Sequence, residues 1–318
     1  MEKETPKAVR THKGAGYKLH EEVKKPTTAL LRATQIGVLS YDEPSLATQA
    51  NKDALLVVSY GAAQKEARKA AVEPLMEAIA EANPKVDIYE AYSSPIMRAK
   101  IREKTGKDIL MADEALETLA QNGYTRVAAA SLHLFPGMEY VCMVDLFNDY
   151  KTRFKRLVLG VPLLYWMGQE EQRDDAADLT EALRKSLPPL AEDEAVLVMA
   201  HGTQHPANAF YAILQTRFAM AGWKRAFVYT IAGWPRLEHI TPILRAKGIR
   251  RVRLVPLMLT VGAHVSRDMA GNAPASHRSR LLAEGFEVDI FRRGLGELPA
   301  VRELYVERVN EAWDKLQG

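Results

Sequence analysis

The sequence predicts an α/β fold of two similar, doubly wound domains with parallel sheets and an active site in the cleft between them. Short apolar runs alternate with longer amphipathic runs over most of the chain, which is typical of the strands and helices of such a fold. Two pairs of segments also repeat from the first half of the chain to the second. The 318 residues, 47% of them apolar, are enough for two ordinary domains with sizeable cores.

Eight short apolar runs are expected to be buried parallel strands. They cover residues 54–59, 86–91, 127–132, 156–159, 195–200, 226–231, 252–257 and 288–291. The amphipathic runs are expected to be helices at residues 65–82, 112–121, 175–187, 207–221, 235–246 and 299–316. Two helix ends are marked by Gly123 and Gly248, because glycine readily adopts the left-handed conformation that follows a helix.

The chain is expected to divide into four parts. Residues 1–50 are polar, rich in Lys and Thr and without sustained periodicity, and we interpret them as an N-terminal arm. An N-terminal α/β domain at residues 51–170 and a C-terminal α/β domain at residues 171–295 follow. Residues 296–318 are expected to form a closing C-terminal helix.

Composition excludes several classes of protein. The net charge of +3 is too balanced to indicate nucleic acid or a membrane surface as a partner, and the single cysteine, Cys142, excludes an internal disulfide framework. No apolar stretch approaches the roughly 18 residues of a membrane-spanning helix. Glycine-rich nucleotide-binding motifs are absent, so no nucleotide is expected. We expect a cytoplasmic protein, although a periplasmic one whose export signal had been removed would look the same.

The internal repeat brings four polar or aromatic residues into corresponding positions. Residues 54–61 read ALLVVSYG and residues 195–202 read AVLVMAHG, which pairs Tyr60 with His201. Residues 132–139 read LHLFPGME and residues 257–264 read LMLTVGAH, which pairs Glu139 with His264. All four follow the ends of expected strands, where open parallel sheets bind ligands. We therefore expect the four side chains to converge on one cleft.

His201 and His264 are the candidate metal ligands and catalytic residues. A neutral imidazole binds Co, Fe, Ni or Zn well, and its near-neutral pKa suits it to accept a proton. Glu139 is the third catalytic candidate, as a carboxylate ligand or a proton acceptor. Structural explanations stand beside each role: His201 could cap the next helix, His264 could be a solvated loop residue, and Glu139 could simply suit a helix N-terminus. For His133 a packing role is favoured, and His205 is expected at a helix N-terminus.

Basic and aromatic residues are expected to bind the substrate. Arg98, Lys100 and Arg102 follow the second strand, and Arg267 and Arg278 follow His264. Guanidinium and ammonium groups bind carboxylates, so this grouping suits a polyanionic small ligand, although solvated helix faces explain it equally well. Tyr60 and Trp234 complete the set as aromatic residues, with Tyr60 placed to stack on a planar ligand or to fill the cleft wall.

At this point the chain resembles the anaerobic sirohydrochlorin cobaltochelatases of the CbiK type. The resemblance covers residue 53 to the C-terminus. Its segments are LLVVSYG at 55–61, SLH at 131–133, GMEY at 137–140, LGVPLL at 159–164, HGT at 201–203, GWP at 233–235, PLML at 256–259, DMAG at 268–271 and GLGE at 294–297. It implies a pair of similar α/β domains, with His201 and His264 as the metal-binding and proton-accepting histidines. It further implies insertion of Co²⁺ into sirohydrochlorin, with Fe²⁺ or Ni²⁺ as other metals, and a basic rim for the ring's carboxylates.

The chain departs from the family pattern at three positions. Ala62 stands where the family has Thr, and Ala232 and Ala263 stand where it has Glu and Asp, so Glu139 is the remaining acidic candidate. These changes keep a second expectation open, namely a carrier that binds a metal or a haem-like tetrapyrrole without turnover. The oligomeric state, including a homo-oligomer, is also left open.

Overall fold

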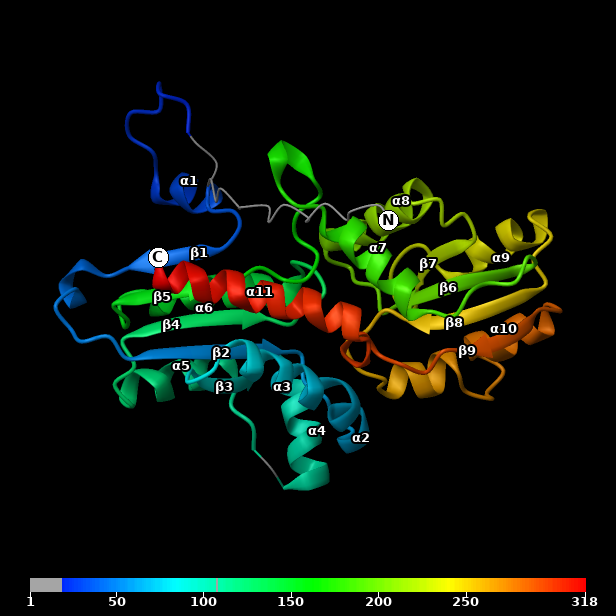
Figure 1. The fold of residues 1–318 in the computed structure, drawn as a ribbon, viewed down its shortest axis with the longest axis horizontal. Coiled ribbons are helices and arrows are strands. Elements are labelled where there is room, and N and C mark those ends of the chain that lie inside the picture. Colours follow the sequence, from blue (N-terminus) through cyan, green and yellow to red (C-terminus); the bar gives the residue numbers. More distant parts are fainter. Residues whose placement is uncertain (1–18, 107) are drawn as a thin grey trace, which may run out of the picture.

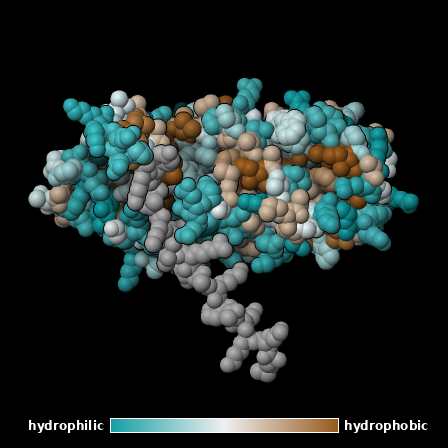
Figure 2. All heavy atoms as spheres, turned by 90° about the horizontal axis from the view of Figure 1, so that it is seen from above, coloured by the Kyte–Doolittle hydropathy of each residue, from teal (hydrophilic) through white to brown (hydrophobic). Residues whose placement is uncertain are grey.

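Two β-sheets lie end to end, and one long helix crosses from the first to the second (Figure 1). The structure is a computed structural model that describes residues 19–106 and 108–318. In the described part of the chain, the first sheet has five strands and the second has four. The face seen in Figure 2 is mainly hydrophilic, with separate smaller hydrophobic patches.

The first sheet is mixed, with the strand order β1-β5-β4-β2-β3. Strands β2, β3, β4 and β5 are parallel, and β1 pairs antiparallel with β5 at one edge. The strands are β1 (Leu39–Asp42), β2 (Asp53–Ser59), β3 (Asp87–Tyr92), β4 (Arg126–Ser131) and β5 (Arg156–Leu159). The central strand β2 is buried along almost its whole length, as expected for a parallel strand covered on both faces.

Helices cover both faces of the first sheet. The helices of this half are α1 (Thr28–Ala33), α2 (Lys65–Ala67), α3 (Glu73–Ala82), α4 (Pro95–Thr105), α5 (Ala112–Gln121) and α6 (Met138–Tyr150), of which α3, α5 and α6 contribute buried residues to the two cores. Leu55 and Val57 of β2 pack in a core with α3, whereas Leu56 and Val58 pack in a separate core with α5 and α6. The two-residue alternation of a strand thus divides β2 between two helical layers.

The second sheet is parallel, with the order β7-β6-β8-β9. Its strands are β6 (Glu194–Ala200), β7 (Ala226–Thr230), β8 (Arg251–Pro256) and β9 (Glu287–Ile290). Its helices are α7 (Asp175–Ser186), α8 (Ala209–Met220), α9 (Leu237–Ala246) and α10 (His277–Ala283). Residues of α7 and α8 pack on one face of β6, and residues of α9 and α10 pack on the other.

The last helix, α11 (Pro299–Gln317), packs against both halves: β4, β5 and α3 in the first and α7 in the second. A single apolar core includes Leu55 of β2, Val309 of α11 and Val198 of β6, so it is continuous through the molecule. Inside this join, Arg308 of α11 donates to the carboxylate of Asp175 at the start of α7, and both side chains are almost completely buried.

The predicted fold class is confirmed, and each of the eight expected strands matches β2 to β9 within one residue at each end. Two expectations need correction. Residues 39–42 lie in the expected arm but form β1, so the first sheet is not wholly parallel. The expected helix 65–82 contains a π-helical turn, Arg68–Val72, between α2 and α3. Residues 1–18 of the expected arm lie outside the described residues, and the divisions after residues 50, 170 and 295 stay predictions. Among the described residues, no helix is both long and apolar enough to span a membrane.

Candidate active site

His201 is the first residue after β6, in a turn that requires glycine at the next position. Gly202 has φ +83°, and a Cβ atom on it would lie 2.3 Å from the main-chain nitrogen of Gly233. The turns after β6 and β7 can therefore approach this closely only without a side chain at Gly202. Asn208 joins the same two turns, because its side chain accepts from the amide of Thr203 (3.3 Å) and donates to the carbonyl of Trp234 (2.8 Å).

His264 begins a π-helical turn, His264–Met269, that follows β8 in the chain. Its Nδ1 lies 2.7 Å from Oδ2 of Asp268. Arg267 donates to Oδ1 of the same carboxylate at 2.6 Å. Arg267 and then His264 lower the pKa of Asp268 to about 2, so Asp268 is ionised at neutral pH and accepts hydrogen bonds only.

The two imidazoles lie side by side, with ring centres 4.9 Å apart and planes at 77°. His201 Nδ1 is 2.8 Å from the carbonyl oxygen of Gly202, and His264 Nδ1 faces the Asp268 carboxylate. Both neighbours are acceptors, so each Nδ1 carries the hydrogen and each Nε2 keeps a free lone pair. The sequence prediction that His201 and His264 are close together is thus correct, although both come from the second half of the chain.

The spacing of the two rings suits one metal ion. If both Nε2 atoms faced one metal ion at about 2.1 Å, each ring centre would lie about 3.2 Å from it, and the 4.9 Å separation of the centres would correspond to an angle of about 100° at the metal. That value lies between octahedral and tetrahedral angles. Within residues 19–106 and 108–318, no cluster of three or more His, Cys, Asp or Glu residues could hold a metal. The role of the histidine pair as metal ligands stays a prediction.

An aromatic contact connects this pair with the first half of the molecule. Phe135, in the turn after β4, packs edge-to-face on Tyr211 of α8, with ring centres 5.3 Å apart. The hydroxyl oxygen of Tyr211 accepts a hydrogen bond from the amide of Gly202 at 3.3 Å. A Cβ atom on Gly137 would lie 3.3 Å from the Phe135 ring and 3.7 Å from Oε2 of Glu139. The turn that holds Phe135 leads into α6, whose second residue is Glu139, and it contacts the tyrosine that bonds the turn of His201.

The aromatic substrate-binding candidates are exposed at strand ends. Tyr60 follows β2 and is 46% exposed, and Trp234 follows β7 and is 59% exposed. Neither side chain is part of the hydrophobic core, so both are accessible to a ligand.

The basic candidates are mostly engaged by groups of the chain itself. Arg98 donates to Asp108 and Glu114 at 2.7 Å, and Arg102 donates to Asp108 at 2.8 Å. These two arginines lower the pKa of Asp108 to about 2. In the second half, Arg267 binds Asp268 and Arg278 donates to Asn272 at 3.0 Å. Lys100 is exposed on α4. Their role as carboxylate-binding residues stays a prediction.

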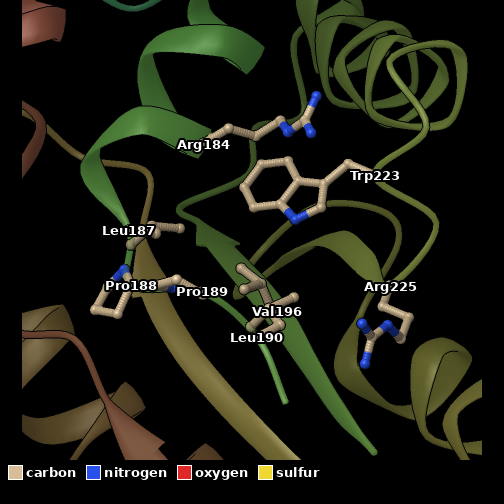
Figure 3. Close-up of a pocket in the computed structure, with 8 residues that line it drawn as sticks. All are labelled: Arg184, Leu187, Pro188, Pro189, Leu190, Val196, Trp223 and Arg225. Atoms are coloured by element: carbon tan, nitrogen blue, oxygen red, sulfur yellow. The ribbon is translucent and has the colours of Figure 1, made fainter. Parts of the chain in front are cut away.

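The sequence analysis missed Phe135, Tyr211 and Asn208, which hold the turns around His201. No local pattern marks them, because their partners are fixed only when the two halves meet. The expected place of His205 is confirmed: its Nδ1 accepts from the amide of Ala207 at a helix start. The hollow in Figure 3, which includes Trp223 and Arg225, is a separate feature. It is lined by Val196 near the beginning of β6, whereas His201 follows the end of that strand.

Comparison with known proteins identifies close sequence relatives. A family model described as cobalt chelatase (CbiK) matches residues 53–314. The chain is 34% identical over 261 residues to a sirohydrochlorin cobaltochelatase of Salmonella typhimurium, covering 82% of this chain and 96% of that one. It is 31% identical over 284 residues to the sirohydrochlorin cobaltochelatase CbiKC of Nitratidesulfovibrio vulgaris, covering 87% and 96% of the two chains.

Solved structures share the fold at lower identity. SirB from Bacillus subtilis with Fe³⁺ has a TM-score of 0.55 and 16% identity, covering 82% of this chain and 95% of that one. The sirohydrochlorin chelatase SirB from Bacillus subtilis subspecies spizizenii in complex with cobalt has a TM-score of 0.53 and 15% identity, covering 84% and 97%. At these identities the two structures support the architecture alone.

Proposed function

The chain belongs to the cobalt chelatase (CbiK) family, and on this premise we propose that it is an enzyme that inserts Co²⁺ into sirohydrochlorin. In this reaction two N–H bonds of the ring break, bonds form between the ring nitrogens and Co²⁺, and two protons leave. The protein must therefore hold the metal near the ring and accept protons. Both the sequence relatives and the family model support this assignment.

The observation that carries the proposal is the His201–His264 pair with both Nδ1 atoms hydrogen-bonded to acceptors. This leaves the two Nε2 atoms as metal ligands. Once the ring nitrogens have replaced them on Co²⁺, the same Nε2 lone pairs are free to accept the protons that leave the ring, which is the role of a general base. Glu139, from the first half, is proposed as a further proton acceptor, since Ala232 and Ala263 supply no carboxylate.

The ring is proposed to lie between the halves. Tyr60 and Trp234 are exposed aromatic residues at strand ends of different sheets, suited to contact a flat macrocycle. Lys100, Arg267 and Arg278, together with Arg98 and Arg102, are proposed to meet its carboxylates. Arg98 and Arg102 already donate to Asp108, and a ring carboxylate would have to replace Asp108 or share these donors with it. We therefore expect each to contribute less binding free energy than an unpaired cation would.

The direct test is anaerobic incubation of the purified protein with sirohydrochlorin and Co²⁺, followed by absorbance of the ring. His201→Ala and His264→Ala should each slow insertion by about 100-fold or more, because each removes a metal ligand. His205→Ala is the matched control, since His205 caps a neighbouring turn, and it should retain the wild-type rate. Tight binding of the ring without any insertion above background would reject the enzyme and favour the carrier.

Several finer points stay predictions. Fe²⁺ or Ni²⁺ as alternative metals can be tested in the same assay by replacing Co²⁺. The carrier of a metal or haem-like tetrapyrrole receives no support from the comparisons. A cytoplasmic location, or a periplasmic one after removal of an export signal, is not tested by the fold, and neither is a homo-oligomer.

A further inference from the structure

Three neighbouring strands of the first sheet end at serines. Ser59 closes β2, Ser131 closes β4, and Ser93 follows β3 directly. Because β4, β2 and β3 are adjacent in the sheet, these serines lie along one edge. His133, two residues after β4, is 9% exposed and lies among them.

The imidazole of His133 connects two of these strand ends. Its Nε2 is 2.8 Å from Oγ of Ser93, and its Nδ1 is 2.8 Å from Oγ of Ser131. The Ser93 hydroxyl also donates to the carbonyl oxygen of Ser59 at 3.3 Å. With its hydrogen used there, Ser93 accepts from Nε2–H, and Nδ1 accepts from the hydroxyl of Ser131. The bonds therefore run in one direction from β4 through His133 to β3 and β2.

We propose that His133 is a positioning residue that fixes the ring-facing turns of the first half by bonding Ser93 to Ser131. The inference rests on the proposed function. Tyr60 comes directly after Ser59, and Glu139 lies six residues after His133, at the start of α6. The positions of these two proposed site residues therefore depend on where the strand ends lie. The metal-binding pair is in the other half, so His133 acts on the ring and its protons and leaves metal binding unaffected.

Burial supports a permanent rather than a switchable connection. Desolvation lowers the pKa of His133 to about 4, so the imidazole is neutral through the working range of pH and both hydrogen bonds persist. A leucine would fill much of the same volume but accept and donate nothing. It would leave the buried hydroxyl of Ser131 and the half-buried hydroxyl of Ser93 without this partner, which is costly where water cannot replace it.

The first experiment separates the ring from the metal. For His133→Leu we expect the Kd of metal-free sirohydrochlorin to rise about tenfold and kcat to fall about tenfold, because misplacement of contact groups by a fraction of an ångström has effects of this size. The KM for Co²⁺ should stay at the wild-type value. If His133 served stability alone, His133→Leu would lower the melting temperature but would not change the Kd of the ring while leaving the KM for Co²⁺ unchanged.

A double-mutant cycle tests the mechanism. Ser93→Ala and His133→Leu should each impair ring binding, and the loss in the double variant should be smaller than the sum of the two single losses, because both remove the bond between Ser93 and His133. Ser59→Ala is the matched control, since Oγ of Ser59 has no hydrogen-bond partner among the described residues while its carbonyl is retained. It should bind and turn over like the wild type. His133→Gln, which keeps polar atoms in place of the imidazole, should restore part of the loss.

The outcome distinguishes this inference from the proposed function. If the wild type inserts Co²⁺ and both His133→Leu and Ser93→Ala keep the wild-type Kd and kcat, the role of His133 is rejected and the function stands. If the wild type binds the ring but inserts nothing, the proposed function fails, and the Kd series still decides the role of His133. Should His133→Leu not fold, Ser93→Ala and Ser131→Ala carry the same test, and wild-type values in both would overturn it.

Discussion

At the scale of residues, the chemistry of the histidine pair is set by the atom behind each ring. His201 is oriented by a main-chain carbonyl, which substitution cannot easily remove, whereas His264 is oriented by the side chain of Asp268. Acceptors behind a metal-binding imidazole fix its tautomer and raise its basicity. Asp268 therefore offers the most direct way to change the proposed metal site without replacing either of its two proposed ligands.

Asp268→Asn should lower the rate of Co²⁺ insertion by about 10- to 100-fold, the usual cost of losing such an orienting group. The asparagine amide can donate to Nδ1, which favours the tautomer with hydrogen on Nε2 and blocks the lone pair that binds the metal. The insertion assay and the KM for Co²⁺ measure this effect. Asp193→Asn, which removes a carboxylate paired with Arg251 before β6, is the control and should keep the wild-type rate. Equal rates in both variants would exclude Asp268 from the site.

A residue's role could be predicted from the sequence when the residues it contacts are near it in the chain. His201 and His264 were found because each follows a strand end and belongs to the repeat, and Asp268 is only four residues from His264. His133 was assigned a packing role. Its burial agrees with that, but its bond to Ser93 joins residues 40 positions apart and depends on the strand order of the sheet. No local pattern contains that information.

At the scale of elements, the turn between β6 and α8 requires glycine for two separate reasons. Gly202 has φ +83°, which disfavours any other residue, and its Cβ position is occupied by Gly233. Gly222, at the end of α8, has φ +72° but open space around its Cβ position. Comparing alanine substitutions at Gly202 and Gly222 therefore separates the free-energy cost of the left-handed backbone conformation from the cost of the steric clash with Gly233.

Gly202→Ala should destabilise the protein by several kcal/mol and abolish insertion, because the methyl group forces the turns after β6 and β7 apart. Gly222→Ala should cost only about 1 kcal/mol, the penalty of the left-handed conformation alone, and leave insertion unchanged. Chemical denaturation and the insertion assay measure both. A Gly202→Ala variant no less stable than Gly222→Ala would contradict the close approach of the two turns.

A helix or strand could be predicted where its own apolar pattern identifies it without reference to the residues it pairs with. The parallel strands are near-continuous apolar runs, so β2 to β9 were located within one residue. Strand β1 was missed because its four residues, LSYD, alternate for too short a distance, and its partner β5 lies more than 100 residues later. The π-helical turn in the expected helix 65–82 has no sequence signature that the apolar pattern could reveal.

At the scale of the whole molecule, α11 decides how the two halves are held. The sequence predicted it as a closing helix, but not that it packs on both halves. Asp175 accepts hydrogen bonds from the amides of Tyr165 and Trp166 and from the side chains of Arg173 and Arg308. This buried ionic group lies where the chain passes from the first half to the second. The two-domain architecture could be predicted from the duplication, whereas this join could not, because it has no counterpart in the repeat.

Arg308→Met should destabilise the protein by about 3–5 kcal/mol, because it leaves the buried carboxylate of Asp175, and the half-buried one of Glu311, with less compensation. The helix itself tolerates methionine well, so the loss would come from the ion pair. Arg302→Met is the control on the same helix, where a half-buried guanidinium donates to a main-chain carbonyl and has no carboxylate partner among the described residues, and it should cost less than about 1 kcal/mol. Equal unfolding free energies for the two variants would show that the join does not depend on this ion pair.

The pH dependence of stability should carry the signature of two buried histidines. Burial lowers the pKa of His133 and of His277 from 6.5 to about 4. Between about pH 6.5 and pH 4, the two imidazoles are therefore protonated in the unfolded chain but neutral in the folded chain. The stability that each histidine contributes is therefore complete above pH 6.5 and is lost as the pH falls through this window, by about 2–3 kcal/mol each at pH 4.5.

Because burial also raises the pKa of Asp175 to about 7, which produces the opposite trend, the test compares variants rather than absolute curves. His277→Gln keeps a polar group beside the hydroxyl of Tyr229 but cannot be protonated. Its unfolding free energy should be below that of the wild type at pH 7.5, and the difference should shrink or reverse toward pH 4.5, since only the wild type pays for the neutral histidine. A difference that is constant between these pH values would mean that His277 titrates alike in the folded and unfolded chains.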